Sequence, residues 1–201
     1  VFNLDQYLLE FNTQLQKHFD NHGRFNYSVS ESSFDTWLDG YVPGVPGRKV
    51  SIYTEGCLLA FVSDVMILKG TDNQFGLDTV MKQLYFDYYL QGKGVSESDY
   101  KSVLEKVSGI SFDELFNDFV NGNRPFESII TEALEYIGLE LHHSPSPLYS
   151  QGRLGFKAIP LGNNFIVKLL YPGGPASLGG LMLEDEVIAI NGISFNGELD
   201  K

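Results

Sequence analysis

The chain has 201 residues, of which 43% are apolar and 20% charged, and this composition is typical of a folded globular protein. Its 26 acidic and 14 basic side chains give a formal net charge of −12, so we expect no nucleic-acid partner, because phosphate recognition needs clustered lysine and arginine. No stretch approaches the ~20 consecutive apolar residues of a transmembrane helix, so no membrane span is expected in this chain. The single cysteine, Cys57, excludes an intrachain disulfide, and its apolar neighbours predict a buried thiol.

The first two thirds of the chain have the spacing of helices. The first helix is predicted by an amphipathic stripe with steps of three and four residues, ending near Gly23. The stripe consists of Leu4, Leu8, Phe11, Leu15 and Phe19. Further helices are predicted at 33–38, capped by Ser33, and at 50–68, 76–90 and 126–136, with two more opening at Ser96 and Ser111. Together they predict an all-α block.

The composition changes at 142–147, where two histidines precede alternating serine and proline. Beyond this point apolar residues alternate with a period of two, beginning with Leu154 and Phe156, and Gly162-Asn163-Asn164 indicates a hairpin. We therefore predict a helical domain over 1–141, a linker over 142–150 and a β module over 151–201.

The β module resembles the PDZ family. A proline and small residues over 172–181 lead into a Gly-Leu step, and Glu184-Asp185-Glu186-Val187 and Asn191-Gly192 follow in the family's order, with Glu184 where the family has glycine. The fold class expected is multidomain α plus β, an all-α helical block followed by a partial PDZ-like β module. The alternative is an unrelated β-hairpin module with an Asn-Gly turn.

Upstream of this pattern, Arg153, Leu154, Gly155 and Phe156 resemble the carboxylate-binding loop of PDZ domains. In that loop successive backbone N–H groups bind the carboxylate of a peptide terminus, and the next strand pairs with the peptide. The module at 151–201 is shorter than a PDZ domain, so we expect a truncated module without the groove helix. Its apolar strand faces are then uncovered unless they pack on the helical block or on a neighbouring molecule.

The helical block resembles the glycyl aminopeptidase family of zinc metallopeptidases. The resemblance rests on Ser33-Phe34-Asp35-Thr36-Trp37 and on Ser51-Ile52-Tyr53-Thr54-Glu55-Gly56 at the start of an apolar helix. It implies a thermolysin-like catalytic domain, a helical domain and a C-terminal PDZ domain, of which this chain resembles the C-terminal part. Because the chain begins at Val1 rather than methionine, we expect its N-terminus to be a cut end.

In that family the tyrosine of a Tyr-x-Lys-Gly stretch faces the zinc site and stabilises the oxyanion of the tetrahedral intermediate. The resemblance makes Tyr53 the candidate catalytic residue, and Glu55 replaces the lysine. The alternative for Tyr53 is a tyrosine at a helix start whose hydroxyl only meets water.

The metal-binding motif of such enzymes, His-Glu-x-x-His, is absent from this sequence. His18 and His22 have the four-residue spacing, but Phe19 occupies the position of the base, so we predict a solvated helix terminus rather than a metal site. His142 and His143 are interpreted as linker. Zinc is therefore expected in the full-length protein and none in this fragment, which by itself should hydrolyse nothing.

The function expected is that of a C-terminal fragment of a zinc-dependent aminopeptidase that hydrolyses N-terminal residues of peptides. Its partners would be peptide or protein substrates, with peptide termini bound at the PDZ-like module. The alternative is a non-catalytic peptide-binding or scaffold protein, which the replacement of lysine by Glu55 favours. Because many bacterial relatives in that family are exported, the resemblance implies a periplasmic or secreted protein, with a cytoplasmic one as the alternative.

Overall fold

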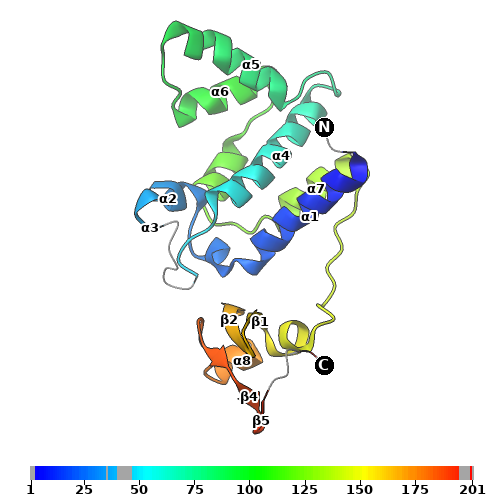
Figure 1. Ribbon diagram of the computed structural model, residues 1–201. Helices are drawn as coiled ribbons and strands as arrows, with labels where there is room; N and C mark the ends of the chain where they lie inside the picture. Colours follow the sequence, from blue (N-terminus) through cyan, green and yellow to red (C-terminus); the bar gives the residue numbers. More distant parts are fainter. Residues whose placement is uncertain (1–2, 35, 40–46, 195–199, 201) are drawn as a thin grey trace. The chain divides into compact units, whose positions relative to one another are not determined.

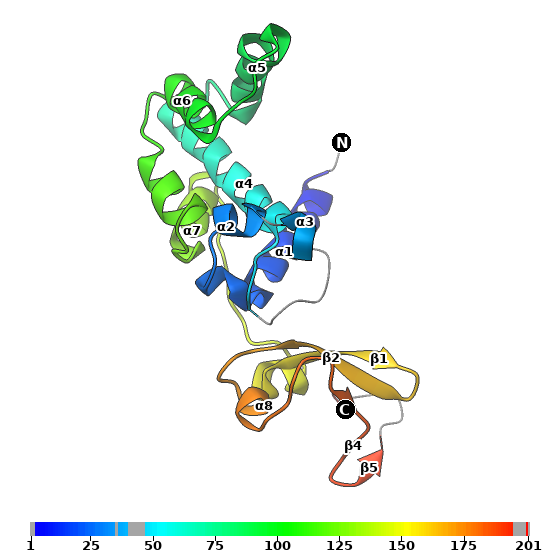
Figure 2. The ribbon, with the colours of Figure 1, turned by 90° about the vertical axis from the view of Figure 1, so that its left-hand side faces the viewer.

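Two units make up the chain, Val1–Leu141 and His142–Lys201. The computed structural model describes residues 3–34, 36–39, 47–194 and 200. The first unit is helical and the second holds the strands (Figures 1 and 2). The α plus β class predicted from the sequence is therefore confirmed. None of the described helices has the combination of length and apolarity that a bilayer crossing requires.

The first unit is built around one long apolar helix, α4. Its described helices are α1 (Leu4–Asp20), α2 (Val29–Phe34), α3 (Thr36–Asp39), α4 (Ile52–Gly70), α5 (Leu77–Asp87), α6 (Glu97–Ser108) and α7 (Glu127–Tyr136), with 3-10 helices η1 (His22–Phe25) and η2 (Tyr89–Gln91) and a π-helix η3 (Leu115–Val120). α4 contacts α1, α2, α5, α6 and α7. Apolar residues lie all around α4, as expected of a helix that is covered on several sides.

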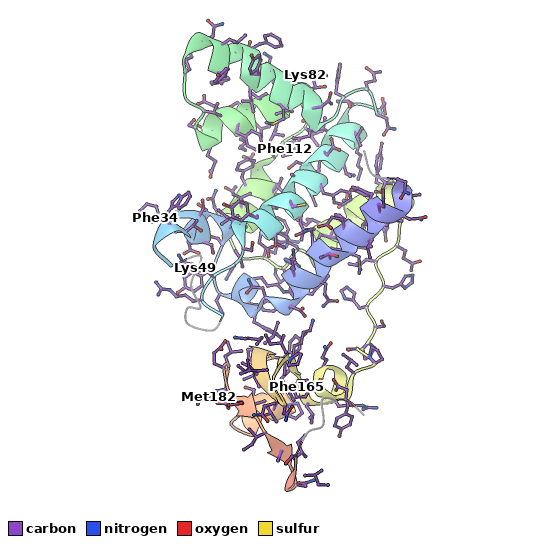
Figure 3. All side chains as sticks on the ribbon, viewed as in Figure 1. Phe34, Lys49, Lys82, Phe112, Phe165 and Met182 are labelled. Carbon is purple, nitrogen blue, oxygen red and sulfur yellow. The ribbon has the colours of Figure 1, made fainter. Side chains whose placement is uncertain are left out.

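The core of the first unit lies where these helices meet α4. Leu58, Ile67 and Phe112 are fully buried in it. Figure 3 shows Phe112 among the helices and Phe34 at the surface, where its side chain is 93% exposed. The first position of the predicted α1 stripe does not belong to this core, because Leu4 is 69% exposed.

Local capping explains where several helices begin. Ser96 forms the predicted capping box with Asp99 at the start of α6. The short helix predicted at 33–38 is wrong in its start: Ser33 lies inside α2, and Ser28 and Glu31 exchange the capping hydrogen bonds, with Glu31 N–H to Ser28 Oγ at 3.1 Å. Asp35 lies outside the described residues.

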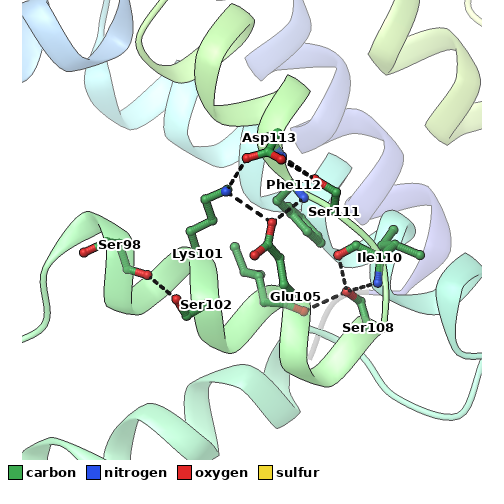
Figure 4. Close-up of polar contacts among 10 residues, drawn as sticks. Ser98, Lys101, Ser102, Glu105, Ser108, Ile110, Ser111, Phe112 and Asp113 are labelled. Atoms are coloured by element: carbon green, nitrogen blue, oxygen red, sulfur yellow. Dashed lines mark hydrogen bonds and ion pairs between the residues drawn. The ribbon is translucent and has the colours of Figure 1, made fainter.

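The passage from α6 to η3 is held by a polar network (Figure 4). Glu105 accepts the backbone N–H of Phe112 at 2.9 Å, and Lys101 pairs with both Glu105, at 3.3 Å, and Asp113. The Ser111 hydroxyl accepts the Asp113 N–H at 3.0 Å, as the predicted helix start at Ser111 requires. The segment continues as a π-helix rather than as a regular α-helix.

The second unit contains two small antiparallel sheets. Its described elements are a π-helix η4 (Ser150–Leu154), β1 (Phe156–Leu161), β2 (Asn164–Leu170), α8 (Pro175–Leu178), β3 (Glu186–Val187), β4 (Ala189–Ile190) and β5 (Ile193–Ser194). The first sheet has the order β1-β2-β3 and the second pairs β4 with β5. In Figure 3, Phe165 of this unit is buried and Met182 is at the surface, 67% exposed.

Turn chemistry determines both hairpins of the second unit. β1 and β2 pair up to Leu161 and Asn164, which confirms the hairpin predicted from Gly162-Asn163-Asn164. Asn191 and Gly192 have φ values of 52° and 79° and join β4 to β5, the two positive φ angles of a type I′ turn. Leu154, predicted as a strand residue, instead ends η4, because the chain turns through Gly155 before β1 begins.

Candidate functional site

Tyr53 lies in the first turn of α4, and its side chain is 67% exposed. The helix begins after Ser51, whose hydroxyl accepts the Thr54 N–H at 3.3 Å and whose carbonyl accepts the Glu55 N–H at 2.9 Å. Ser51 therefore sets the backbone direction of the turn that carries Tyr53.

The segment that leads into α4 is fixed by two close contacts. A Cβ placed on Gly23 would lie 2.1 Å from the Lys49 carbonyl oxygen, so only glycine allows η1 to approach the chain there. The buried Ser32 hydroxyl accepts the N–H of buried Val50 at 3.2 Å. The sequence indicated Gly23 only as the end of a helix, whereas the structure shows that it also makes room for the segment before Tyr53.

Glu55 and His18 form a buried pair between α4 and α1. His18 Nδ1 lies 2.7 Å from Glu55 Oε2, and the two side chains are 1% and 2% exposed. The His18 ring also stacks on Phe126, with 5.0 Å between ring centroids. The predicted solvated helix terminus is therefore wrong for His18, because Glu55 provides a buried partner for its imidazole.

This pair is incompletely satisfied by the described residues. His18 Nε2 and Glu55 Oε1 are buried and have no hydrogen-bond partner among them. Buried polar atoms without a partner are costly, so the pair is a weak source of stability. Arg24 donates a hydrogen bond to the Glu127 carboxylate at 2.8 Å. Burial raises the pKa of the Glu127 carboxyl, but a backbone hydrogen bond and Arg24 outweigh this effect, so the pKa is lowered overall.

A cavity of about 460 Å³ lies beside the first turn of α4. It is lined by Gln14, Lys17, Asn21, Ser51, Tyr53, Thr54, Glu55 and Cys57. Tyr53 thus lies at a hollow of a size suited to a small ligand or part of a peptide.

Cys57 shares the exposed face of α4 with Tyr53, four residues earlier. The predicted buried thiol is therefore wrong, because the apolar neighbours of Cys57 in sequence point to other sides of the helix. Gly56 lies on the same side, and a Cβ added there would meet no atom within 4 Å.

The described residues contain no group of three or more histidine, cysteine, aspartate or glutamate side chains placed to hold a metal ion. His22, the second histidine of the spaced pair, lies in η1, outside the helix that carries His18. Burial, followed by the nearby Arg24 charge, lowers the pKa of the His22 imidazole. The donor set present in the described chain therefore does not fit a zinc site.

The predicted carboxylate-binding residues lie at the start of the second unit's sheet. Arg153 and Leu154 end η4, Gly155 has a left-handed φ of 81°, and buried Phe156 opens β1. The Gly155 N–H donates to the carbonyl of Ser150, so this group is already hydrogen-bonded within the unit. No described contact identifies a ligand for this loop.

Sequence reasoning did not find the His18–Glu55 pair or the cavity. A signal for His18 was present, because it follows Phe11 and Leu15 at the spacing of the α1 stripe and these three residues are buried. Glu55 gave a second signal, since a carboxylate inside an apolar helix needs a partner. Nothing local in the sequence connected the two residues, which are 37 positions apart.

Part of the sequence that lines this cavity is similar to that of a peptidase family. Residues 1–59 match the family model of M61 glycyl aminopeptidase. The matched segment runs from α1 through the first turns of α4 and includes His18, Tyr53 and Glu55, so the resemblance expected from the sequence is confirmed there. The second unit, with the expected PDZ resemblance, lies outside the match and is not tested by it, and no curated protein matches the chain.

Proposed function

We propose that this chain is part of a zinc-dependent aminopeptidase that removes N-terminal residues from peptides, and that Tyr53 is its catalytic residue. The observation that carries the proposal is the position of Tyr53: it lies in the segment that matches the peptidase family, is 67% exposed, and lines the cavity beside α4. A tyrosine that only covered the core would not have this exposure.

The proposed role of Tyr53 is to donate a hydrogen bond from its hydroxyl to the oxyanion that forms when water attacks the peptide carbonyl. A donor fixed before the reaction stabilises that charge as it develops. The first turn of a helix also carries a partial positive charge, which favours negative charge nearby. The position of Tyr53 in α4 thus combines a donor with a favourable electrostatic potential.

Zinc is assigned in this proposal to other residues of the protein, because the donor set of the described chain does not fit it. Zinc would polarise the carbonyl and activate water when bound. The residues of this chain would orient the substrate beside the cavity and place the Tyr53 hydroxyl. The chain alone is proposed to bind no catalytic zinc and to hydrolyse nothing.

The test is the substitution Tyr53→Phe in the zinc-bearing protein, with kcat and KM measured on short peptides. We expect kcat to fall on the order of a hundredfold or more, the usual cost of removing an oxyanion donor. The melting temperature should change little, because the hydroxyl is on an exposed side chain. Tyr89→Phe, at a tyrosine that is 69% exposed on η2, is the matched control and should leave kcat unchanged. An unchanged kcat in Tyr53→Phe removes Tyr53 from the mechanism.

A second candidate function, peptide binding without catalysis, is favoured by the position of β1. Among the strands that the structure describes, β1 is at the edge of its sheet and directly follows Gly155, which is where a peptide strand would pair with the sheet. Pro160 lies in β1, where the missing N–H is tolerated only at such an edge. Titration with one labelled peptide carrying either a free or an amidated C-terminus tests this function; equal or absent binding of both forms would exclude carboxylate recognition.

A further inference from the structure

We propose that Glu55, through its buried bond to His18, is a positioning residue that sets the direction of Tyr53. The inference rests on the proposed function, since it concerns the same tyrosine. It assigns a role to Glu55, which replaces the lysine of the family's Tyr-x-Lys-Gly stretch, and to His18, which the sequence had indicated only as part of a solvated helix terminus.

Tyr53 and Glu55 lie two residues apart in the first turn of α4. Successive residues of an α-helix are about 100° apart, so Tyr53 and Glu55 project from nearly opposite sides of α4. Their exposures agree, because Tyr53 is 67% exposed and Glu55 is buried. An anchor on the Glu55 side therefore fixes the rotation of the first turn about its axis, and with it the direction in which Tyr53 points.

The bond between His18 and Glu55 connects α1 to α4. The Ser51 cap lies within the same segment and moves with the start of α4, whereas Glu55 is bonded to His18 in the last turn of α1. The His18 ring is in turn held by its stacking on Phe126, which precedes α7. The orientation of Tyr53 is thus tied to α1 through the His18–Glu55 bond, and to the start of α7 through the contact between the His18 and Phe126 rings.

The pair contributes little to stability, because it is buried and ionisable and two of its atoms have no hydrogen-bond partner among the described residues. An apolar pair of similar volume is often as stable or more so. Apolar side chains, however, have no preferred bond direction. The consequence expected from removing the pair is therefore a loss of orientation at Tyr53 rather than unfolding of the helical unit.

The experiment compares variants of the zinc-bearing protein by kcat, KM and thermal unfolding. In the double variant His18→Leu/Glu55→Leu we expect the melting temperature to be retained or raised. We expect kcat to fall on the order of tenfold to a hundredfold with KM nearly unchanged, because a small misplacement of a catalytic group has effects of this size. An unchanged kcat in this folded variant overturns the proposal.

A second comparison measures kcat in two single substitutions of His18, and it tests the proposal even if the double variant does not fold. His18→Asn keeps a donor near the place of Nδ1, whereas His18→Leu removes it, and both lose the ring that stacks on Phe126. The asparagine variant should therefore retain most of the activity that the leucine variant loses. Equal kcat in the two variants would assign the effect to the lost ring rather than to the bond.

A third comparison distinguishes this inference from the proposed function. If Glu55 acts through Tyr53, adding Glu55→Leu to Tyr53→Phe should lower kcat no further, because the group being positioned is already gone. A multiplicative effect overturns the positioning role. If Tyr53→Phe slows the reaction and the Glu55 variants do not, only this inference fails; if Tyr53→Phe has no effect, the proposed function fails with it.

Discussion

Gly56 is a glycine in the interior of α4 at a position where the first unit does not require one. A Cβ added there meets no atom within 4 Å, and glycine in a helix interior costs roughly 1 kcal/mol relative to alanine. Gly56→Ala should therefore raise the free energy of unfolding by up to about 1 kcal/mol, measured by urea titration. Because Gly56 lies on the Tyr53 side of α4, we expect kcat/KM to fall if substrate approaches that face.

Gly70 provides the matched control in the same helix. There a Cβ would lie 2.7 Å from the Ser108 carbonyl oxygen, so Gly70→Ala should destabilise the protein although it makes the same chemical change. Destabilisation of both variants to the same extent would show that Gly56 is also held by packing.

Glu184 adopts a left-handed backbone, with φ of 68°, a conformation that favours glycine. This conformation costs a non-glycine residue about 1–2 kcal/mol, and asparagine tolerates it better than glutamate does. The Glu184 carboxylate also pairs with Lys168, at 2.7 Å and 2.8 Å. A substitution of Glu184 alone would therefore remove this ion pair together with the backbone strain.

The strain is therefore best measured in a Lys168→Met background, where this exposed ion pair is already absent. Adding Glu184→Asn should then raise the free energy of unfolding by about 0.5–1 kcal/mol in urea titration. No gain, or a loss, would show that the turn does not strain Glu184.

At the scale of elements, α5 begins with a cap that comes from another helix. Its N-cap residue, Gly76, has no side chain, and Asp64 of α4 accepts the Leu77 N–H at 2.6 Å. Asp64→Ala should lower the free energy of unfolding by about 1–2 kcal/mol and speed hydrogen exchange in the first turn of α5. Asp78→Ala, which removes an exposed pair with Lys82, is the control and should have the smaller effect.

Because of the polar network between α6 and η3, we expect the free energy of unfolding to fall at acidic pH. The Phe112 N–H, and then Lys101, lower the pKa of Glu105, and Lys101 lowers that of Asp113. A carboxyl whose folded pKa is below its unfolded value stabilises the fold above the unfolded pKa, and this contribution is lost as pH falls through the folded pKa. From the ordinary values of 4.5 and 3.8, the loss should begin near pH 4.5 and continue below 3.8.

Glu105→Gln is the variant that tests this assignment. Its amide oxygen still accepts the Phe112 N–H but cannot titrate, so stability should fall less steeply with acid below pH 4.5 than in the parent protein. The measurement is the urea midpoint as a function of pH. A slope identical to that of the parent would assign the acid sensitivity to other carboxyls.

Elements set by local chemistry were predictable from the sequence. The capping box at Ser96, the turn at Gly162 and the positive φ angles at Asn191 and Gly192 depend on residues within a few positions of one another. The site was only half predictable: the family resemblance indicated Tyr53, and the helix start placed it on an exposed turn. The α1 stripe contained a signal for the burial of His18, but its pairing with Glu55 depends on a tertiary contact that no local pattern encodes.

At the scale of the whole molecule, the two units differ in the size of their cores. The first unit has a large cluster of buried apolar side chains from six elements around and including α4. In the described part of the second unit, the fully or nearly buried apolar side chains are Phe156, Phe165 and Val167. Because apolar burial is the main source of stability, we expect the second unit to open more readily than the first.

Hydrogen exchange followed by mass spectrometry measures this difference in the intact chain. Amides of β2 should exchange faster than amides of α4 around Leu58 and Val62, which are 0% and 2% exposed. Exposed apolar side chains of the second unit, such as Ile159 at 50% and Ile193 at 75%, add nothing to its core. Exchange of β2 and α4 at one common rate would mean that the units unfold as one. A partner that covers these side chains should instead slow exchange in the second unit and leave α4 unchanged, because ligand binding stabilises only the unit that it contacts.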